Sequence, residues 1–527
     1  MPATHARAVA AAVLRNGGNA VDAAVAAAFT LAVVQPEAGN IGGGGFMTIF
    51  MDGEARFLDY RETAPAAASR NMFLGPDGKP DADESLVGHR ASGVPGTVAG
   101  LWAAHQRYGT RTWAELVAPA VDLARNGFTV YPALAQYARE ALTDLAGTNF
   151  AAHFAALTTT RRFRQPDLAD TLQRIAENGA DEFYRGRTAR LLAAEMARGG
   201  GLITREDLAG YRAIWRDPID FRWRDYRVLT APPPSSGGVA IAQLLKMYEA
   251  RGGDFADLGH NSAAYVHLNA ELAKRVFADR AVYLGDPDFV SVPVDSLIDD
   301  DYLRARASEA NPAQITRPRP VPVIAEHNDT THFSIVDGAG NAIANTYTIN
   351  TSFGSGVVVT GAGFLMNNEM DDFAVAPNSP NYFGLVGSEA NAIAPGKRML
   401  SSMSPTIALR DGKVALVVGA MGGSAIITSV YQVMLNLEAF GMEAPEALAA
   451  TRVHHQFPPD DLITYDPSGA LPTEAVAGLE ALGYRVEPHS WAFGNVQLIW
   501  RNREGVLQAA SDERFSGASE VLRTPPP

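Results

Sequence analysis

Two adjacent threonines, Thr330 and Thr331, stand at the start of a β-branched segment and carry the most specific chemistry in this sequence. A threonine hydroxyl acts as a nucleophile when a nearby base accepts its proton. If the bond between Asp329 and Thr330 is cut, the new α-amine of Thr330 can be that base, because the reference pKa of such an amine is about 7.7 to 8. One residue would then supply both the nucleophile and the base.

The length of a hairpin loop predicts what lies beside this threonine. Residues 331–337 and 341–350 have the alternation of two strands, and the glycines of residues 338–340 predict a three-residue turn between them. Counting back along this hairpin places Thr330 opposite Thr348. The segment before it, residues 311–328, contains four prolines and predicts an extended or flexible linker in which a cleavage site would be accessible.

Side chains alternate along a strand, so Thr346, Thr348 and Asn350 share one face. A hydroxyl and an amide would therefore stand next to Thr330. Threonine-rich strands also occur for structural reasons alone, because β-branched residues favour sheets. Spacing leaves both interpretations open.

Three carboxylates fall within four positions at Glu369, Asp371 and Asp372, after an apolar segment at residues 364–366 that we expect to be a strand. Metal-binding loops for hard cations usually add more widely spaced oxygen ligands and a glycine turn. The cluster is better suited to an ammonium group. An acidic loop exposed to water is the alternative.

Gly422 and Gly423 offer two adjacent backbone N–H groups that no Cβ obstructs. Donors of this kind stabilise the oxyanion of an acyl-transfer reaction. A tight turn before a helix at residues 426–437 is the alternative interpretation. His454 and His455 raise the possibility of a zinc site, but adjacent residues on a strand point to opposite faces, which disfavours it.

Residues 329–334, together with the acidic cluster and the glycine pair, resemble the γ-glutamyltransferase (γ-glutamyl transpeptidase) family of N-terminal-nucleophile hydrolases. The resemblance runs from about Asn16 to Gln456. It implies an α+β fold, a four-layer αββα sandwich. It also implies a zymogen that cleaves itself between Asp329 and Thr330 into two interleaved subunits, residues 1–329 and 330–527.

The resemblance assigns a role to each matching position. Thr330 would be the nucleophile, Thr348 would hydrogen-bond it, and the N–H groups of Gly422 and Gly423 would hold the oxyanion. The substrate would be held through its α-amine and α-carboxylate by six further residues: Asn350, Glu369 and Asp372, and Arg61, Ser401 and Ser402. Arginine suits a carboxylate because its planar fork binds bidentately. Without the resemblance, a surface ion-pair arginine and turn serines would be the favoured interpretations.

The activity implied is cleavage of the γ-glutamyl bond of glutathione and related amides, with transfer to water, amino acids or peptides, and without a cofactor. Residues 377–384 match a lid found in some members, with Phe383 in the place of a frequent tyrosine. Met421 replaces a frequent proline, and Ala425 stands where larger residues are common. These departures bear on substrate preference more than on the chemistry.

Two other functions stay open. A cephalosporin or glutaryl acylase of the same fold would act on an acyl group without the α-amine, but Glu369, Asp372 and Arg61 weigh against it. An unprocessed, inactive binding homologue is the second alternative, and the presence of both Thr330 and Thr348 argues against that.

The composition of the chain limits the classes of partner that we expect it to bind. The chain has 527 residues, enough for a large core. It lacks cysteine, which removes disulfides, thiolate metal sites and cysteine nucleophiles. A net charge of −14 argues against nucleic acid or an anionic membrane as the main partner. A small molecule or peptide, and the chain's own cleaved subunit, are the expected partners.

Several helices must position these residues, and the sequence predicts them at residues 20–34, 98–108, 112–126 and 239–250. The first is apolar but shorter than the roughly twenty residues that cross a bilayer, so we expect a buried core helix with Asn19 as N-cap and Asp22 at N3. The four glycines at residues 42–45 lack the Lys-Ser/Thr ending of a phosphate loop and indicate a tight turn.

The N-terminus has no signal-peptide pattern. Members of the resembling family usually have one more strand and often an export signal before the first helix, so we interpret Met1 as a shortened start. A periplasmic or secreted location is what the family implies, and the sequence leaves a cytoplasmic one open.

Overall fold

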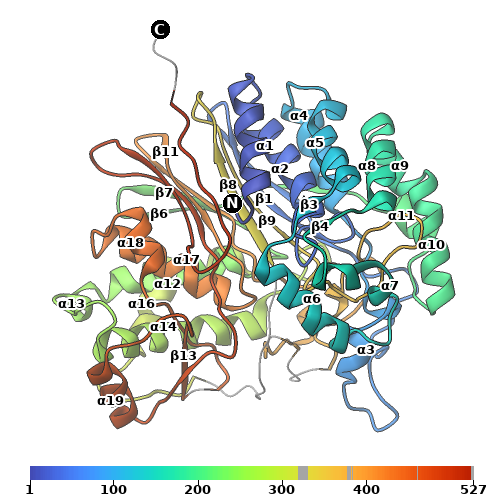
Figure 1. Ribbon diagram of the computed structural model, residues 1–527. Coiled ribbons are helices and arrows are strands. Elements are labelled where there is room, and N and C mark those ends of the chain that lie inside the picture. The colour runs from blue at the N-terminus through green and yellow to red at the C-terminus, as the bar shows by residue number, and fades with distance from the viewer. Residues whose placement is uncertain (319–329, 377–380, 383, 460, 524–527) are drawn as a thin grey trace.

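Two antiparallel β-sheets, stacked face to face, form the centre of the molecule (Figure 1). The computed structural model describes residues 1–318, 330–376, 381–382, 384–459 and 461–523. In spatial order, the first sheet contains β5 (Ile214–Arg216), β2 (Glu54–Tyr60), β1 (Gly44–Met51), β9 (Ala342–Thr348) and β8 (Thr331–Val336). The second contains β16 (Leu507–Ser511), β15 (Gln497–Arg501), β11 (Lys413–Gly419), β10 (Thr406–Arg410), β7 (Tyr226–Thr230) and β6 (Ile219–Trp223).

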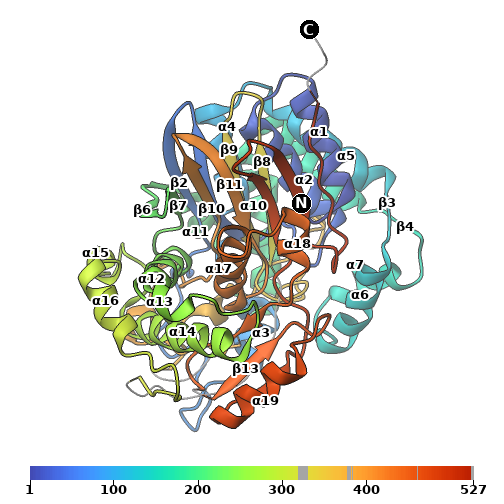
Figure 2. The same ribbon diagram turned by 90° about the vertical axis from the view of Figure 1, so that its left-hand side faces the viewer.

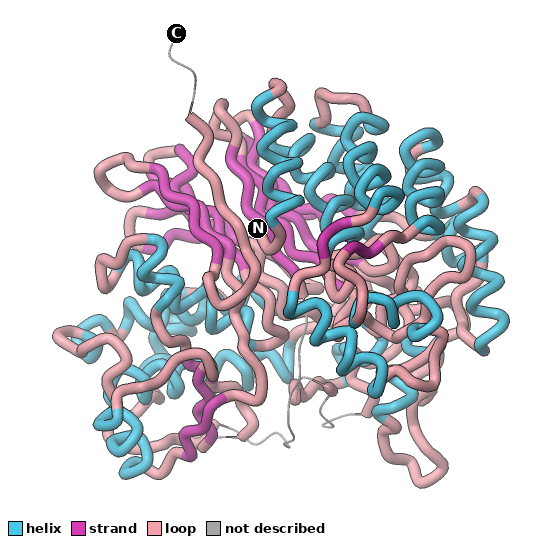
Figure 3. Tube along the Cα trace, viewed as in Figure 1, coloured by secondary structure: helices cyan, strands magenta, loops and turns pink. Residues whose placement is uncertain are grey.

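Helices cover the outer face of each sheet (Figures 2 and 3). Buried apolar side chains from both sheets form a cluster between them. The first sheet packs against α2 (Ala20–Val34) and α4 (Thr97–Tyr108), with α1 (Thr4–Arg15) and α5 (Trp113–Asn126) beside them. The second packs against α12 (Gly237–Ala250), α17 (Ala425–Glu438) and α18 (Ala444–Ala449), with α14 (Ala263–Tyr283) against α12. This arrangement is the predicted four-layer αββα sandwich, which is confirmed.

Both sheets combine strands from before and after Thr330. In the first sheet, β1 pairs with β9, and in the second, β7 pairs with β10. A cut before Thr330 would therefore leave the two fragments joined by sheet hydrogen bonds and a shared core.

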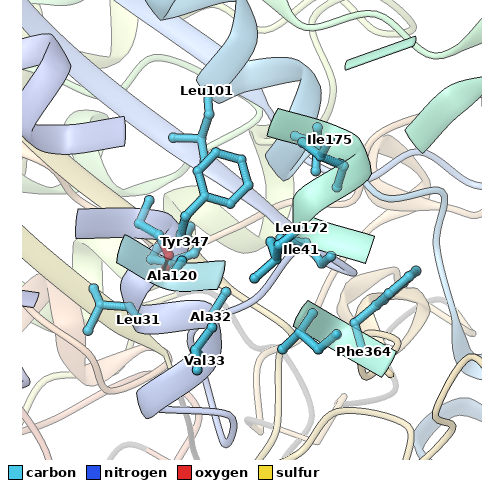
Figure 4. Packing of buried hydrophobic residues seen from close by; sticks show 14 of the residues in the cluster. Leu31, Ala32, Val33, Ile41, Leu101, Ala120, Leu172, Ile175, Tyr347 and Phe364 are labelled. Carbon is cyan, nitrogen blue, oxygen red and sulfur yellow. Dashed lines mark hydrogen bonds between the residues drawn. The ribbon is translucent and has the colours of Figure 1, made fainter. Parts of the chain in front are cut away.

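Helix α2 is buried along its whole length, as predicted. Its N-terminus has a capping box in which Asn19 and Asp22 satisfy each other's backbone N–H groups. Figure 4 shows Leu31, Ala32 and Val33 in one buried apolar cluster with Tyr347 of β9 and side chains of the neighbouring helices. Small side chains let the layers approach closely.

The predicted helices are present as α4, α5, α12 and α17. Three strands that the sequence analysis did not identify, β5, β6 and β7, lie within the mainly helical first half. The expected strand at residues 364–366 is wrong: it forms one isolated bridge, between Val358 and Leu365, and no strand of a sheet. Asn367 directs its backbone N–H to the carbonyl of Gly42, so this segment follows the glycine turn and not a sheet edge.

The glycine turn itself is a place of close backbone approach, as expected. A Cβ on Gly43 would lie 2.0 Å from the carbonyl oxygen of Thr348, and one on Gly42 would lie 2.0 Å from that of Leu365. The hairpin of β8 and β9 also has the predicted register, with Thr331 opposite Tyr347 and Asp337 bonded to Asn341.

The remaining elements surround this frame and complete the described chain. The helices are α3 (Ala82–Leu86), α6 (Pro132–Asp144), α7 (Phe150–Phe154), α8 (Pro166–Asn178), α9 (Ala180–Tyr184), α10 (Arg187–Gly199), α11 (Arg205–Gly210), α13 (Gly252–Phe255), α15 (Val294–Leu297), α16 (Asp300–Ser308) and α19 (Thr473–Leu482). The strands are β3 (Phe128–Thr129), β4 (Arg162–Phe163), β12 (Val453–His454), β13 (Leu462–Tyr465) and β14 (Arg485–Pro488). No helix in the described part of the chain has the length and apolar character needed to span a membrane.

Candidate active site

A pocket of about 310 Å³ lies at one end of the two sheets. The ends of three neighbouring strands meet at this point. Antiparallel pairing places Gly44 of β1 opposite Thr348 of β9, and Gly45 of β1 opposite Tyr60 of β2. The lining comprises Arg61, Arg280, Thr330, Thr348, Asn350, Glu369, Asp372, Leu385, Leu400, Ser401, Ser402, Met403, Gly423 and Ile426. Side chains from before and after Thr330 therefore share one cavity.

Thr330 immediately precedes β8 and is 5% exposed. Its Oγ1 donates to Oγ1 of Thr348 at 3.4 Å, and that same oxygen accepts the N–H of Asn350 at 2.8 Å. Asn350 has a left-handed backbone, with φ of 79°, and its side chain donates to the carbonyl of Asn368. The predicted threonine pair is thus in contact. Asp329 lies outside the described residues, so cleavage before Thr330 stays a prediction.

The glycine pair predicted to hold the oxyanion has an unusual backbone conformation. Gly422 and Gly423 have φ of 135° and 48°, values that side chains with a Cβ rarely adopt. Neither N–H donates a hydrogen bond to any residue that the structure describes. Gly423 lines the pocket directly, and Gly422 precedes it in the turn leading into α17. Unpaired N–H groups at a buried turn are suited to a developing negative charge.

One side of the pocket is an ion cluster, which we call the acidic side: Arg61 with Glu62, Glu369 and Asp372. Nη1 of Arg61 lies 2.6 Å from Oε2 of Glu369 and 3.6 Å from Oε2 of Glu62, and Nη2 contacts Asp372. The side chains of Arg61, Glu62 and Glu369 are 1%, 0% and 0% exposed. The predicted cation and the predicted carboxylates therefore contact each other.

Burial and mutual repulsion shape the protonation of the acidic side. Burial raises the pKa values of Glu369 and Asp372, although Arg61 opposes the shift in both. Burial also raises the pKa of Glu62 to about 7. For Arg61, burial would lower the pKa, but the neighbouring carboxylates, Glu369 first, raise it above its ordinary value. With three acids around one guanidinium, the cluster holds protons more firmly than isolated carboxyls do.

Asp371 does not line the pocket, in contrast to Glu369 and Asp372. Its carboxylate accepts the hydroxyl of Ser85 at 2.7 Å and the backbone N–H of Tyr382 at 2.8 Å, away from the pocket, and burial raises its pKa to about 7. Asn381 donates to Asp372 at 3.1 Å. The described part of the predicted lid thus contacts the acidic cluster. Residues 377–380 and Phe383 of that lid lie outside the described residues.

A second part of the pocket lining carries hydroxyls, and we call it the hydroxyl side: Ser401 and Ser402 with Arg280, and Ser236, which contacts Arg280 without lining the pocket. Ser236 donates its N–H and its hydroxyl to the carbonyl of Ser401, both at 2.7 Å. Arg280 donates from Nε to Ser236 Oγ at 3.0 Å and from Nη2 to Ser402 Oγ at 3.4 Å. The loop before α12 therefore holds the predicted serines in place.

Arg280 and Ser236 were not identified from the sequence. Arg280 lies in the last turn of α14. Ser402, which it contacts, follows about 120 positions later in the chain, so no local pattern in the sequence predicts the contact. Ser236 is the residue that directly precedes α12.

His454 and His455 point to different surroundings. His454 Nδ1 lies 2.8 Å from the hydroxyl of Thr428, and His455 Nδ1 lies 2.6 Å from the carbonyl of Leu462. Each ring thus has its own hydrogen-bond partner, and the two do not converge on one point.

The chain is similar to known proteins in both sequence and structure. Residues 6–522 match the family model described as gamma-glutamyltranspeptidase. The chain is 54% identical over 523 residues to a glutathione hydrolase proenzyme from Pseudomonas aeruginosa, which covers 99% of this chain and 94% of that protein. Among solved structures, a gamma-glutamyltranspeptidase from Pseudomonas nitroreducens complexed with L-DON is 53% identical, with a TM-score of 0.60, over 60% of this chain and 95% of that one. A cephalosporin acylase from Bacillus halodurans is 28% identical, with a TM-score of 0.86, over 99% of this chain and 95% of that one.

Proposed function

The chain belongs to the gamma-glutamyltranspeptidase family, and on that premise we propose that it is an autoprocessing γ-glutamyltransferase. It cleaves the γ-glutamyl bond of glutathione and related γ-glutamyl amides and transfers the group to water, amino acids or peptides. The observation that carries the proposal is the Thr330–Thr348 hydroxyl pair in a pocket that also holds Arg61, Glu369 and Asp372.

Processing comes first. The Thr330 hydroxyl attacks the carbonyl carbon of Asp329, and the C–N bond breaks as the ester forms, leaving a free amine on Thr330. Water then opens the ester to give residues 1–329 and 330–527. The strand pairing of β1 with β9 supports a product that stays assembled as a heterodimer.

The polar residues of the pocket suit a substrate head with an amine and a carboxylate on one carbon. Glu369 and Asp372 receive the ammonium, together with the amide of Asn350. Arg61 and the hydroxyls of Ser401 and Ser402 receive the carboxylate. Donors to a charged group contribute more than neutral pairs do, about 1.5 to 3 kcal/mol each.

Catalysis then follows from the free amine. The amine takes the Thr330 proton while the hydroxyl oxygen attacks the γ-carbonyl, and the N–H groups of Gly422 and Gly423 stabilise the oxyanion. The protonated amine gives its proton to the leaving amine, which leaves an acyl-enzyme ester. Water or an acceptor amine resolves that ester. Because an attacking amine must be unprotonated, transfer gains on hydrolysis as pH rises towards the acceptor's pKa.

The acylase alternative has support from the whole-chain similarity to the cephalosporin acylase. An acyl group such as glutaryl lacks the amine, and it would leave Glu369 and Asp372 without a cationic guest. The buried carboxylates therefore favour the γ-glutamyl assignment.

Two measurements test the proposal. Mass spectrometry of the purified protein is expected to give two fragments that join between Asp329 and Thr330. Turnover of γ-glutamyl-4-nitroanilide is expected to exceed that of glutaryl-4-nitroanilide at least tenfold, about the loss of one charged contact, and to accelerate with an added dipeptide. Equal turnover of the two anilides would contradict the γ-glutamyl assignment, and no acceleration at any alkaline pH would leave a hydrolase alone.

A further inference from the structure

Arg280 is a buried arginine whose surroundings differ from those of every other charged group in the pocket. It is 5% exposed and lines the cavity beside Ser402. Within the described chain its guanidinium makes no ion pair within 4.0 Å, and it donates hydrogen bonds to two hydroxyls, those of Ser236 and Ser402. Its pKa is lowered to about 10 by burial, with Asp372 as the charge that opposes the shift.

Charge is distributed unevenly between the two arginines. Arg61 contacts three carboxylates, whereas Arg280 contacts none. Burying a cation without an anionic partner costs desolvation free energy. A ligand carboxylate beside such a cation would offset part of that cost. A carboxylate that enters the pocket would meet a guanidinium at Arg61 that already contacts three carboxylates, and one at Arg280 that contacts none of the described carboxylates.

The hydrogen bonds of Arg280 also orient the serines. Ser402 Oγ accepts from Nη2, so its own proton is left to point elsewhere, and no described residue accepts it. Ser236 Oγ accepts from Nε and donates to the carbonyl of Ser401, which joins the guanidinium to the backbone of the second serine. Oγ of Ser401 accepts the N–H of Met403, so its proton is free in the same way.

We propose that Arg280 is a positioning residue for the α-carboxylate of the γ-glutamyl donor, acting through the hydroxyls of Ser401 and Ser402 and through its own charge, which no described carboxylate pairs within 4.0 Å. This inference rests on the proposed function. It adds the hydroxyl side to recognition of the donor head: Glu369 and Asp372 bind the ammonium, and Arg61 binds the carboxylate together with the hydroxyl side.

A set of three anilides tests this division: γ-glutamyl-4-nitroanilide, glutaryl-4-nitroanilide, which lacks the amine, and 4-aminobutanoyl-4-nitroanilide, which lacks the carboxylate. Arg280→Met is expected to lower kcat/KM about 10- to 100-fold for the two donors with a carboxylate, mainly through KM. For 4-aminobutanoyl-4-nitroanilide the change in kcat/KM is expected to stay within about twofold, because this substrate has no carboxylate for Arg280 to position. Arg280→Lys, which keeps the charge but loses the fork, is expected to fall between.

Arg275→Met is the matched control. Arg275 is also buried on α14, but it pairs with Glu271 and does not line the pocket. Its substitution is expected to affect all three anilides alike. If Arg280→Met also lowers all three equally, Arg280 supports the fold only and the inference is wrong.

A binding experiment separates this inference from the proposed function. If the wild-type protein turns over no γ-glutamyl donor, the proposed function fails. Calorimetry can then still measure how Arg280→Met changes the affinity for L-glutamate and for 4-aminobutyrate. If the processed Arg280→Met protein does not assemble, the same comparison is made in the Thr330→Ala background. Equal affinity for L-glutamate with and without Arg280→Met would overturn the inference, and a selective loss for L-glutamate would support it.

Discussion

The acidic side and the hydroxyl side of the pocket each centre on one buried arginine, but they compensate its charge in opposite ways. Arg61 is surrounded by Glu62, Glu369 and Asp372, and burial raises the pKa of each of these acids. Arg280 has hydroxyl oxygens as its partners, and burial lowers its pKa. The first side has an excess of acid and suits an ammonium, and the second has an excess of positive charge and suits a carboxylate.

This difference would let one pocket bind a zwitterion through carboxylates in one part and a guanidinium without a carboxylate contact in the other. The two sides are built from different parts of the chain. Arg61 follows β2, which belongs to the first sheet, whereas Ser401 and Ser402 precede β10 of the second. Thr330, which immediately precedes β8, lines the same pocket, and its substitution gives the largest expected effect.

Thr330→Ala is expected to abolish both processing and turnover, because it removes the nucleophile of each reaction. Denaturing electrophoresis should show one chain of 56.1 kDa in place of two fragments. Thr331→Ala is the matched control, since that hydroxyl donates to Gln35 at 3.0 Å on the opposite face of β8. Thr331→Ala is expected to process normally. Cleavage at the same bond in Thr330→Ala, without added protease, would exclude the proposed mechanism.

Arg61→Met is expected to destabilise the fold more than Arg280→Met does, which is the most direct test of the contrast between the two sides. It leaves three buried carboxylates without their cation, and such losses typically cost about 3 to 5 kcal/mol. Urea unfolding of the single chain in the Thr330→Ala background at pH 8 measures this. An Arg61→Met variant that is no less stable than Arg280→Met would show that the acidic side does not depend on its guanidinium.

Asp372→Asn is expected to weaken kcat/KM for γ-glutamyl-4-nitroanilide by about 1.5 to 3 kcal/mol, because a charged partner of the ammonium is lost. Glutaryl-4-nitroanilide, which lacks that ammonium, should lose much less. Asp371→Asn serves as the control, because Asp371 bonds Ser85 and Tyr382 outside the pocket. If both substitutions reduce the two anilides in the same ratio, Asp372 has no special role in binding the amine.

Glu62→Gln is expected to change the pH dependence of stability by about 1 to 3 kcal/mol, the smallest effect of the four. The pKa of Glu62 is raised from 4.5 to about 7 by burial, so between these pH values the folded chain binds a proton that the unfolded chain releases. The free energy of unfolding therefore falls as pH rises through this window, and Glu62→Gln should flatten that fall. Urea midpoints from pH 5 to 8, in the Thr330→Ala background, measure it. An unchanged slope would place the titration elsewhere in the cluster.

Local signals in the sequence predicted much of the frame. The capping pair of Asn19 and Asp22 and the apolar run that follows were enough to predict a buried helix, because the cap is a signal within one turn and a helix that is apolar all round has no polar face to expose. The three-residue turn after Asp337 was enough to predict the register of β8 and β9, because loop length fixes strand pairing. The short strands β5 to β7 were missed, since runs of three to five residues within a helical region give little periodicity.

The sequence by itself thus determined the chemistry that is available: a threonine that can become a chain terminus, a hydroxyl opposite it, an acidic cluster and a glycine pair that tolerates positive φ. Only the tertiary structure decided which charges meet. It turned Asp371 away from the pocket, set Glu62 against Arg61, and brought Arg280 from α14 to Ser402 across about 120 positions. Electrostatic partners depend on distances in space and on burial, and neither is encoded in the spacing of residues along the chain.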